Sequence, residues 1–312
     1  MRTFRDDARL PDDARGAVWA IGNFDGLHRG HGALFERARA TARAQNALAG
    51  VLTFAPHPAK LLNPSLAPPL ILTDDEKERG IAAAGLDLLC VLRFDARLAA
   101  LSPQAFVQDV LHARLGAAGA VVGEGFRFGH RAAGTVDDLR AGLAHVDVVA
   151  PVREGDLVCS SSKIRELVLE GKTDAAARLL GRPYWLEGEV VVGDRRGHTI
   201  GIPTANLQTA RELLPKLGVY ATSAVLADGR RFQSVTNIGL RPTFAGQSGV
   251  RIEAHLLAFS GDIYGQRLHL DVVARLRDEM RFPGIDALKA QIARDIDAAV
   301  GALDAAAAAG RA

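Results

Sequence analysis

The sequence has few cysteines and little net charge, and both features narrow its class. Two cysteines occur among 312 residues, Cys90 and Cys159, which is too few for a disulfide framework, and neither lies in a CxxC pair. We therefore expect two reduced thiols in a cytoplasmic protein. The formal net charge of +2 gives no overall electrostatic reason to bind nucleic acid or a membrane, so we expect neither as a partner.

Long apolar runs and two common nucleotide-binding motifs are also missing. No segment approaches the roughly 20 apolar residues of a membrane span. Residues 1–15 are rich in Arg and Asp, unlike a signal peptide. The sequence contains neither GxxxxGK[ST], which marks a P-loop, nor GxGxxG, which marks a dinucleotide site. These absences disfavour a P-loop kinase and a standard dinucleotide oxidoreductase.

The first half of the chain alternates short apolar segments with helical patterns, which predicts a parallel, doubly wound α/β sheet. The expected strands are Val18–Ile21, Leu48–Phe54, Leu88–Phe94, Ala120–Gly123 and Val146–Val149. The expected helices are Ala33–Gln45, Thr73–Ala84, Pro103–Leu115, Val136–Ala141, Lys163–Glu170 and Thr173–Leu180. Ligands of such sheets gather where the strands end.

The second half is rich in strand patterns separated by Gly, Asp and Asn turns, which predicts a closed antiparallel barrel. The expected strands are Leu186–Val192, Val219–Leu226, Phe232–Ile238, Arg251–Leu257 and Arg267–Arg275. A helix over Ile285–Ala299 follows, and we expect the alanine-rich tail beyond Leu303 to be a frayed helix end. The predicted domains are residues 1–183 and 184–312.

The most informative stretch of the first half is residues 22–31, with the sequence GNFDGLHRGH. It joins a strand to a helix, and its glycines and the unpaired N–H groups of the helix start suit a phosphate. A metal interpretation of His28 and His31 lacks further ligands nearby. Phosphate stabilisation in nucleotidyl transfer is the better interpretation, because that chemistry requires alignment and charge neutralisation.

Three later segments also end strands or begin helices. The Pro56-His57-Pro58 turn is rigid, and its histidine is equally compatible with a structural role and a ligand contact. The loop 122–129 could stack a flat ring on Phe126 or Phe128, unless these rings belong to the core. Basic residues at the start of the helix that follows Ser160 oppose its dipole, which suits a bound anion or an ordinary surface helix.

The second half has its own candidate phosphate loop, Gly193–Asn206, with spaced glycines and two arginines. Thr204 and Asn206 offer neutral oxygen ligands for Mg²⁺. Glu253 lies on a predicted alternating strand, where it is either an exposed side chain or a general base for a hydroxyl that attacks phosphorus.

The first half resembles the FMN adenylyltransferase module of bacterial bifunctional riboflavin kinase/FAD synthetases, which has a Rossmann-like nucleotidyltransferase fold. The resemblance rests on the Gly22–His31 motif, Pro56–Pro58, Phe126–Gly129 and Ser160–Arg165. It implies that His28, His31 and Arg165 are catalytic. It implies ATP-binding roles for Gly22, Phe24, Asp25, Gly30, Ser161 and Ser162, and flavin-binding roles for Phe54, His57, Phe126 and Phe128.

The second half resembles the riboflavin kinase module of the same enzymes. The resemblance rests on Gly193–Asn206, Gly218–Tyr220, Asn237–Gly239, Glu253–Leu256 and Leu276–Phe282. It implies that Glu253 is the general base and that Mg²⁺ is the cofactor, held by Thr204 and Asn206. It implies that Gly193, Arg195, Gly197 and Gly201 bind ATP and that Arg277 and Phe282 bind the flavin.

The resemblance implies that riboflavin, FMN and ATP are the substrates and that the two reactions give FMN and then FAD. The sequence departs from the family pattern at Gly125 and Lys163, which leaves open an enzyme with only the kinase activity. A flavin-binding protein without catalysis is a second alternative, although such a protein needs no general base. The sequence does not specify an oligomeric state.

Overall fold

The computed structural model describes residues 1–6, 9–193, 201–240 and 249–309 of the chain. These residues form two compact units, Met1–Ser161 and Ser162–Ala312. The predicted domain boundary after residue 183 stays a prediction. By contact, helix α8 (Thr173–Leu180) belongs with the second unit, because it packs against the barrel strands β9 (Tyr184–Val191) and β14 (Arg267–Arg277).

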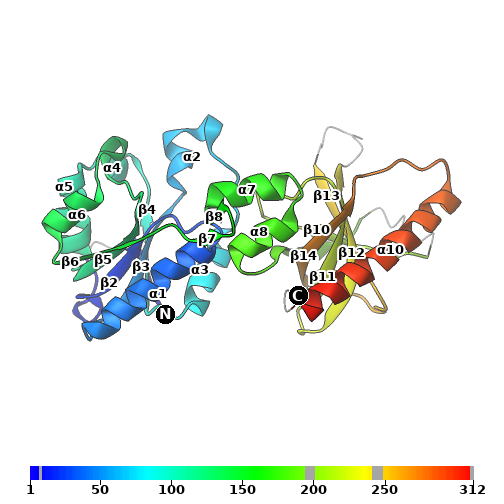
Figure 1. Ribbon diagram of the computed structural model, residues 1–312, viewed down its shortest axis with the longest axis horizontal. Helices are drawn as coiled ribbons and strands as arrows, with labels where there is room; N and C mark the ends of the chain where they lie inside the picture. The colour runs from blue at the N-terminus through cyan, green and yellow to red at the C-terminus, as the bar shows by residue number, and fades with distance from the viewer. Residues whose placement is uncertain (7–8, 194–200, 241–248, 310–312) are drawn as a thin grey trace. The chain divides into compact units, whose positions relative to one another are not determined.

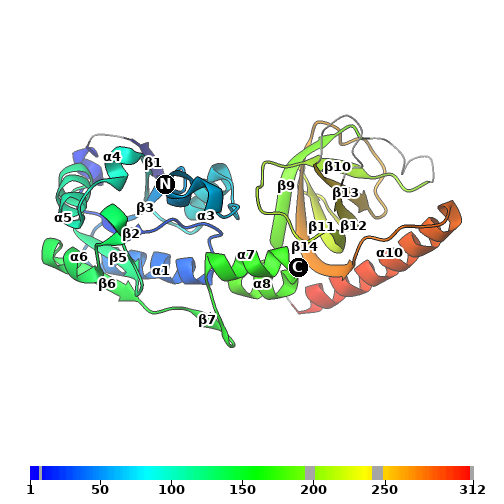
Figure 2. The same cartoon turned by 90° about the horizontal axis from the view of Figure 1, so that it is seen from above.

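The first unit contains a parallel sheet with helices on both of its faces (Figures 1 and 2). Its strands are β1 (Arg2–Arg5), β2 (Val18–Ile21), β3 (Ala49–Ala55), β4 (Leu88–Arg93), β5 (Gly119–Gly123) and β6 (His145–Val149), followed by the small hairpin β7 (Arg153–Glu154) and β8 (Leu157–Val158). Its α-helices are α1 (Arg29–Ala44), α2 (Pro58–Leu62), α3 (Asp74–Ala83), α4 (Ala96–Ala99), α5 (Pro103–Ala105) and α6 (Val136–Gly142), and α7 (Ser161–Leu169) begins at its end. Other helical segments are the 3-10 turns η1 (Asp12–Ala14), η2 (Pro64–Leu66) and η4 (His130–Ala132) and the π-helical η3 (Phe106–Arg114).

The order of the strands in this sheet is β1-β4-β3-β2-β5-β6. Strand β2 lies between β3 and β5, so the chain reverses its direction of progress across the sheet beside β2. In a doubly wound sheet, ligands bind at such a reversal, beyond the carboxyl ends of the strands. The predicted parallel sheet is therefore confirmed, and the 22–31 segment follows β2 at this position.

Two apolar cores fill the space between the sheet and its helices. On one face, Val18 and Ala20 of β2 pack with Phe35 of α1 and Ile81 of α3. On the other face, Trp19 packs with the side chains of η3 and α6. Alternate residues of β2 thus point to opposite cores, as a central strand requires.

The second unit is a closed barrel with the strand order β10-β13-β12-β11-β14-β9, as predicted. The remaining barrel strands are β10 (Ala205–Gln208), β11 (Gly218–Leu226), β12 (Arg231–Leu240) and β13 (Val250–Leu256). Helix α10 (Ile285–Ala308) lies along β11, β12 and β14 (Figure 1). Its buried Ala299 and Leu303 pack against Val219 and Ala221.

Two of the details in which the structure corrects the sequence prediction concern helices. Helix α10 extends to Ala308, and Ala306 in the tail expected to fray is buried. The expected turn around His57 contains the short helix α2, which begins after a cis Ala55–Pro56 bond. None of the helices in the described ranges combines the length and the apolar character of a membrane-spanning segment.

Candidate active sites

His28 and His31 lie together where β2 passes into α1. His28 caps the helix, and its Nδ1 accepts the backbone N–H of His31 at 3.3 Å. The two imidazole rings stack with their centroids 3.6 Å apart. His28 is buried, with 6% of its surface exposed. The structure therefore brings both predicted catalytic histidines to one helix N-terminus, which also favours an anion through its N–H groups.

The neighbouring motif residues pack around these histidines. A Cβ at Gly30 would lie 3.0 Å from the His28 ring, so a side chain at this position would crowd the ring. The Phe24 ring is buried and meets the His31 ring edge-on, with the two ring centroids 5.2 Å apart. It also packs against Gly22. The predicted ATP contact of Phe24 stays a prediction, and the structure gives its ring a packing role beside the histidines.

Asp25, a predicted ATP-binding residue, makes several hydrogen bonds. Its buried carboxylate accepts the backbone N–H groups of Ile71 and Leu72, and its carbonyl oxygen accepts the hydroxyl of Ser161 at 2.8 Å. This hydrogen bond links the loop after β2 to the start of α7, and the ATP-binding roles of Asp25 and Ser161 stay predictions. Farther along α7, in the second unit, Arg165 is buried and Ser162 is exposed.

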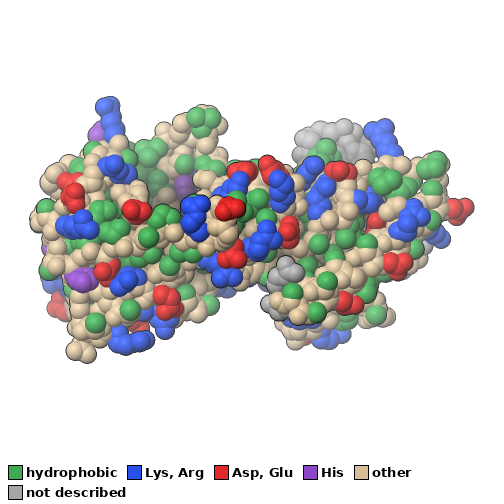
Figure 3. Space-filling model, viewed as in Figure 1, with side chains coloured by type: hydrophobic (Ala, Val, Ile, Leu, Met, Phe, Trp, Pro, Cys, Tyr) green, Lys and Arg blue, Asp and Glu red, His purple; other side chains and the backbone are tan. Residues whose placement is uncertain are grey.

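A cavity of about 820 Å³ lies beside the nucleotide loop and contains three of the predicted flavin-binding residues. Phe126 and Phe128 stack with their ring centroids 5.7 Å apart, and Phe54 also lines the cavity. The walls also include Gly22, Asn23, Leu61, Leu62, Arg127, His130 and Arg131, most of which the sequence interpretation did not single out. Figure 3 shows exposed apolar side chains in the region of helix α2, which contains the exposed Leu61 and Leu62.

His57, the fourth predicted flavin residue, caps α2. Its Nδ1 accepts the N–H of Ala59 at 3.2 Å, and the next residue, Pro58, lines the cavity. Gly125, where the sequence departs from the family pattern, also lines the cavity, and no atom lies within 4 Å of the position of its missing Cβ. The open space there leaves room for a ligand in place of a side chain.

In the second unit, Glu253 lies between two asparagines on adjacent strands. On β13 it is paired with Asn206 of β10 on one side and with Asn237 of β12 on the other. Directly paired residues project from the same face of a sheet, about 4.5–5.5 Å apart at Cβ. The Glu253 carboxylate lies 3.4 Å from the Arg251 guanidinium. The predicted base therefore belongs to a polar row, and Asn237 is a member that received no role from the sequence.

Two glycines allow close packing along this row. A Cβ at Gly193 would lie 2.5 Å from Oδ1 of Asn206, and one at Gly239 would lie 2.1 Å from the Glu279 carboxylate. Gly193 and Asn206 line a cavity of about 380 Å³ together with Arg251. Gly201 lies in the described part of the chain, whereas the predicted ATP ligands Arg195 and Gly197 lie outside the described residues.

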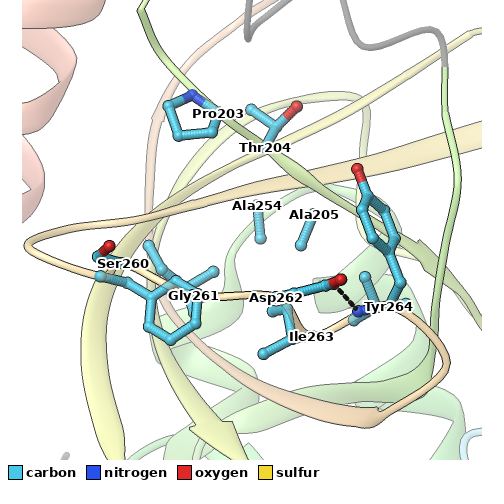
Figure 4. Close-up of a pocket in the computed structure, with 12 residues that line it drawn as sticks. Pro203, Thr204, Ala205, Ala254, Ser260, Gly261, Asp262, Ile263 and Tyr264 are labelled. Atoms are coloured by element: carbon cyan, nitrogen blue, oxygen red, sulfur yellow. Dashed lines mark hydrogen bonds between the residues drawn. The ribbon is translucent and has the colours of Figure 1, made fainter.

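Thr204, the other predicted metal ligand, lines a different cavity of about 370 Å³ (Figure 4). Its neighbours there are mostly apolar, and Phe259 and Tyr264 supply aromatic rings. The oxygen donors of Thr204 and Asn206 suit Mg²⁺, which prefers oxygen ligands. Among the described residues, no three His, Cys, Asp or Glu side chains gather in a way that could hold a metal ion.

The predicted flavin contacts of the second unit are Arg277, the last residue of β14, and Phe282. The Arg277 guanidinium binds the buried Asp295 of α10, with Nε–Oδ1 and Nη2–Oδ2 distances of 2.9 and 2.7 Å. Its guanidinium carbon also lies 5.9 Å from the centre of the Phe282 ring. The flavin role of Arg277 stays a prediction, and its ion pair joins β14 to the terminal helix.

Comparisons with known proteins agree with the resemblance that the sequence shows in each half of the chain. A family model described as FAD synthetase matches residues 10–163, and one described as riboflavin kinase matches residues 180–303. Proteins named bifunctional riboflavin kinase/FMN adenylyltransferase are 39% identical over 287 residues in Escherichia coli K12 (90% of each chain) and 38% identical over 304 residues in Pseudomonas fluorescens (96% of this chain, 97% of the relative). A crystal structure described as a macrolide-efflux protein from Streptococcus pneumoniae is 31% identical, with a TM-score of 0.85 over 95% of this chain and 97% of its own. The chain therefore belongs to the family of bifunctional riboflavin kinase/FMN adenylyltransferases.

Proposed function

We propose that the second unit phosphorylates riboflavin with ATP to give FMN and ADP, and that the first unit transfers AMP from another ATP to FMN to give FAD and pyrophosphate. One observation carries the proposal for each reaction. The stacked histidine pair lies at a helix N-terminus beside an aromatic cavity. In the other unit, the Glu253 carboxylate lies between the amides of Asn206 and Asn237, and Gly193 packs closely against Asn206.

In the first unit, the chemistry requires a phosphate oxygen of FMN to attack the α-phosphorus of ATP while the bond to pyrophosphate breaks. His28 accepts the His31 N–H through Nδ1, so its ring proton is on Nε2, from which it can donate to a phosphate oxygen. The N–H groups of the α1 N-terminus add further positive potential. Both stabilise the negative charge that develops on the phosphate oxygens in the transition state.

The large cavity is the proposed flavin site of this unit. Its volume of about 820 Å³ is within the usual range for ligand pockets, and its aromatic walls suit a flat ring. Arg127 and Arg131 on the wall favour an anionic substrate, which FMN is and riboflavin is not. Phe54, Phe126 and Phe128 would hold the ring by stacking and contact.

In the second unit, Glu253 accepts the proton of the riboflavin 5′-hydroxyl as its oxygen attacks the γ-phosphorus and ADP leaves. We propose Mg²⁺ as the metal, with Thr204 and Asn206 as the residues that would hold it. When bound, such an ion would neutralise charge on the phosphates. The pairing of Asn206 with Glu253 supports the proposed Mg²⁺ site, because it places an oxygen ligand suited to Mg²⁺ next to the proposed base.

The cavity in Figure 4 is the proposed site for the purine ring of ATP. Val190, Leu256 and Ile263 provide apolar contacts, and Tyr264 provides an aromatic face. Thr204 also lines this cavity, so we propose that a nucleotide seated here would bring its phosphates toward this proposed metal ligand.

Incubation of the protein with riboflavin, ATP and Mg²⁺ tests the proposal, with products separated by chromatography. We expect FMN to appear first and FAD to follow. In the His31→Ala variant, we expect FMN to form at the wild-type rate and FAD formation to be abolished. Accumulation of FMN without FAD in the wild type would support the kinase-only alternative that Gly125 and Lys163 leave open.

A further inference from the structure

The Asp25 carboxylate is a buried charged group that the proposed chemistry leaves unused. Only 5% of the residue surface is exposed. Its oxygens lie 3.0 and 3.1 Å from the backbone nitrogen of Ile71, and Oδ1 lies 3.1 Å from that of Leu72. A carboxylate that accepts backbone N–H groups makes stronger, charge-assisted hydrogen bonds. Asp25 therefore anchors the loop after β2 to a segment 46 residues away in the sequence.

The loop that Asp25 anchors has an unusual backbone. Phe24 and Leu27 have φ angles of 52° and 43°, in the left-handed region that side chains disfavour, and Gly26 between them has a φ of 88°. Such residues keep this conformation only when their surroundings hold it, and they concentrate at functional sites. The residue that follows the loop is His28, the cap of α1 and a proposed catalytic group.

Further contacts hold the same loop in place. The Thr53 hydroxyl donates to the carbonyl oxygen of Asn23 at 3.2 Å, and the Ser161 hydroxyl donates to that of Asp25. A Cβ at Gly26 would lie 2.9 Å from the Ile71 side chain, so the loop and the Ile71 segment are in close contact. The carboxylate is the charged centre of these contacts.

We propose that Asp25 is a positioning residue for adenylyl transfer, because its bonds to Ile71 and Leu72 hold the strained loop and thereby place His28 at the reacting phosphate. The inference rests on the proposed function of the first unit and names a role that differs from direct ATP contact.

The Asp25→Asn variant tests this role. An amide keeps the size of the side chain, but it removes the charge and points a donor at a backbone N–H. We expect kcat for FAD formation from FMN and ATP to fall about 10- to 100-fold, because a displacement of about 1 Å has such an effect on catalysis. We expect KM for ATP to change less than threefold, and riboflavin phosphorylation in the same chain to keep its wild-type rate.

Glu76→Gln is the matched control. Glu76 is also a buried carboxylate that accepts a backbone N–H, that of Thr73 at 2.8 Å, but this hydrogen bond belongs to the capping box at the start of α3. We expect it to lower the melting temperature of the first unit and to leave kcat for FAD within twofold of wild type. A purely structural role for Asp25 predicts the same pattern for Asp25→Asn, and that result would overturn the inference.

A second variant, Thr53→Val, covers the case in which Asp25→Asn does not fold. It removes the hydroxyl that holds Asn23, with almost no change in volume, and we expect a two- to tenfold loss in kcat for FAD. Wild-type kcat in this variant would also count against the inference. If wild-type protein makes no FAD at all, the proposed function of the first unit fails. If wild-type protein makes FAD and both loop variants match it, only the positioning role fails.

Discussion

Replacement of Asp295 by alanine tests whether the ion pair between α10 and β14 holds the terminal helix on the barrel. Asp295 has 4% of its surface exposed, and it accepts hydrogen bonds from the Arg277 guanidinium and from the Gln291 amide. Removal of one partner of a buried pair leaves an uncompensated charge, which costs about 3–5 kcal/mol. Because about a fifth of the Arg277 side chain remains exposed, we expect the lower end, about 3 kcal/mol.

For a unit of this size, a loss of 3 kcal/mol lowers the melting temperature by about 6–12 °C. Differential scanning calorimetry measures the melting temperature of the second unit, with the transition of the first unit as an internal reference. The control is Asp304→Ala on the same helix, where an exposed carboxylate binds the Gln233 amide and we expect a change of about 0.5 kcal/mol or less. Equal melting temperatures for the two variants would refute the reasoning about Arg277 and Asp295.

Two further predictions concern pH and thiol chemistry. Burial alone would lower the pKa of His269, but hydrogen bonds and charges from Asp271 and Glu187 outweigh it and raise the pKa to about 9. The protonated histidine therefore stabilises the barrel fully below pH 6.5, and this contribution of about 3 kcal/mol is lost as the pH rises toward 9. In urea titrations the destabilisation by His269→Gln should shrink across that interval, and a difference independent of pH would contradict the ion-pair explanation. Burial, aided by the nearby Glu154 carboxylate, raises the pKa of the Cys159 thiol. Iodoacetamide should therefore alkylate this thiol slowly at pH 8 in folded protein and quickly in urea. Equal rates in the two conditions would show that the thiol is accessible in the folded protein and would contradict the prediction.

The sequence predicted those parts of the fold that depend on local patterns. Strand β2 is a run of four apolar residues that ends before Gly22, and its predicted and observed limits agree. Strand β1 was missed because Arg2–Arg5 contains one apolar residue, and it forms by pairing with β4 at the edge of the sheet. The last turns of α10 were missed because alanines of low hydrophobicity were interpreted as a frayed end, whereas Ala306 is buried.

The sites show the same division between local and distant contacts. The histidine pair could be predicted because both residues lie in one short motif at a strand–helix junction. The partners of Asp25 could not, since Ile71 and Leu72 approach it only through the tertiary fold. The row of Asn206, Glu253 and Asn237 depends on the register of three strands, which single strand patterns do not specify.

The central claim is that two independent sites share FMN as an intermediate, and a mixing experiment with two variants tests it most directly. His31→Ala alone should convert riboflavin to FMN only, and Glu253→Ala alone should leave riboflavin unchanged but convert supplied FMN to FAD. A mixture of the two variants with riboflavin, ATP and Mg²⁺ should produce FAD, because FMN made by one protein can reach the intact first unit of the other. FAD formation from riboflavin by Glu253→Ala alone, or no FAD from the mixture while each variant keeps its own reaction, would contradict the claim.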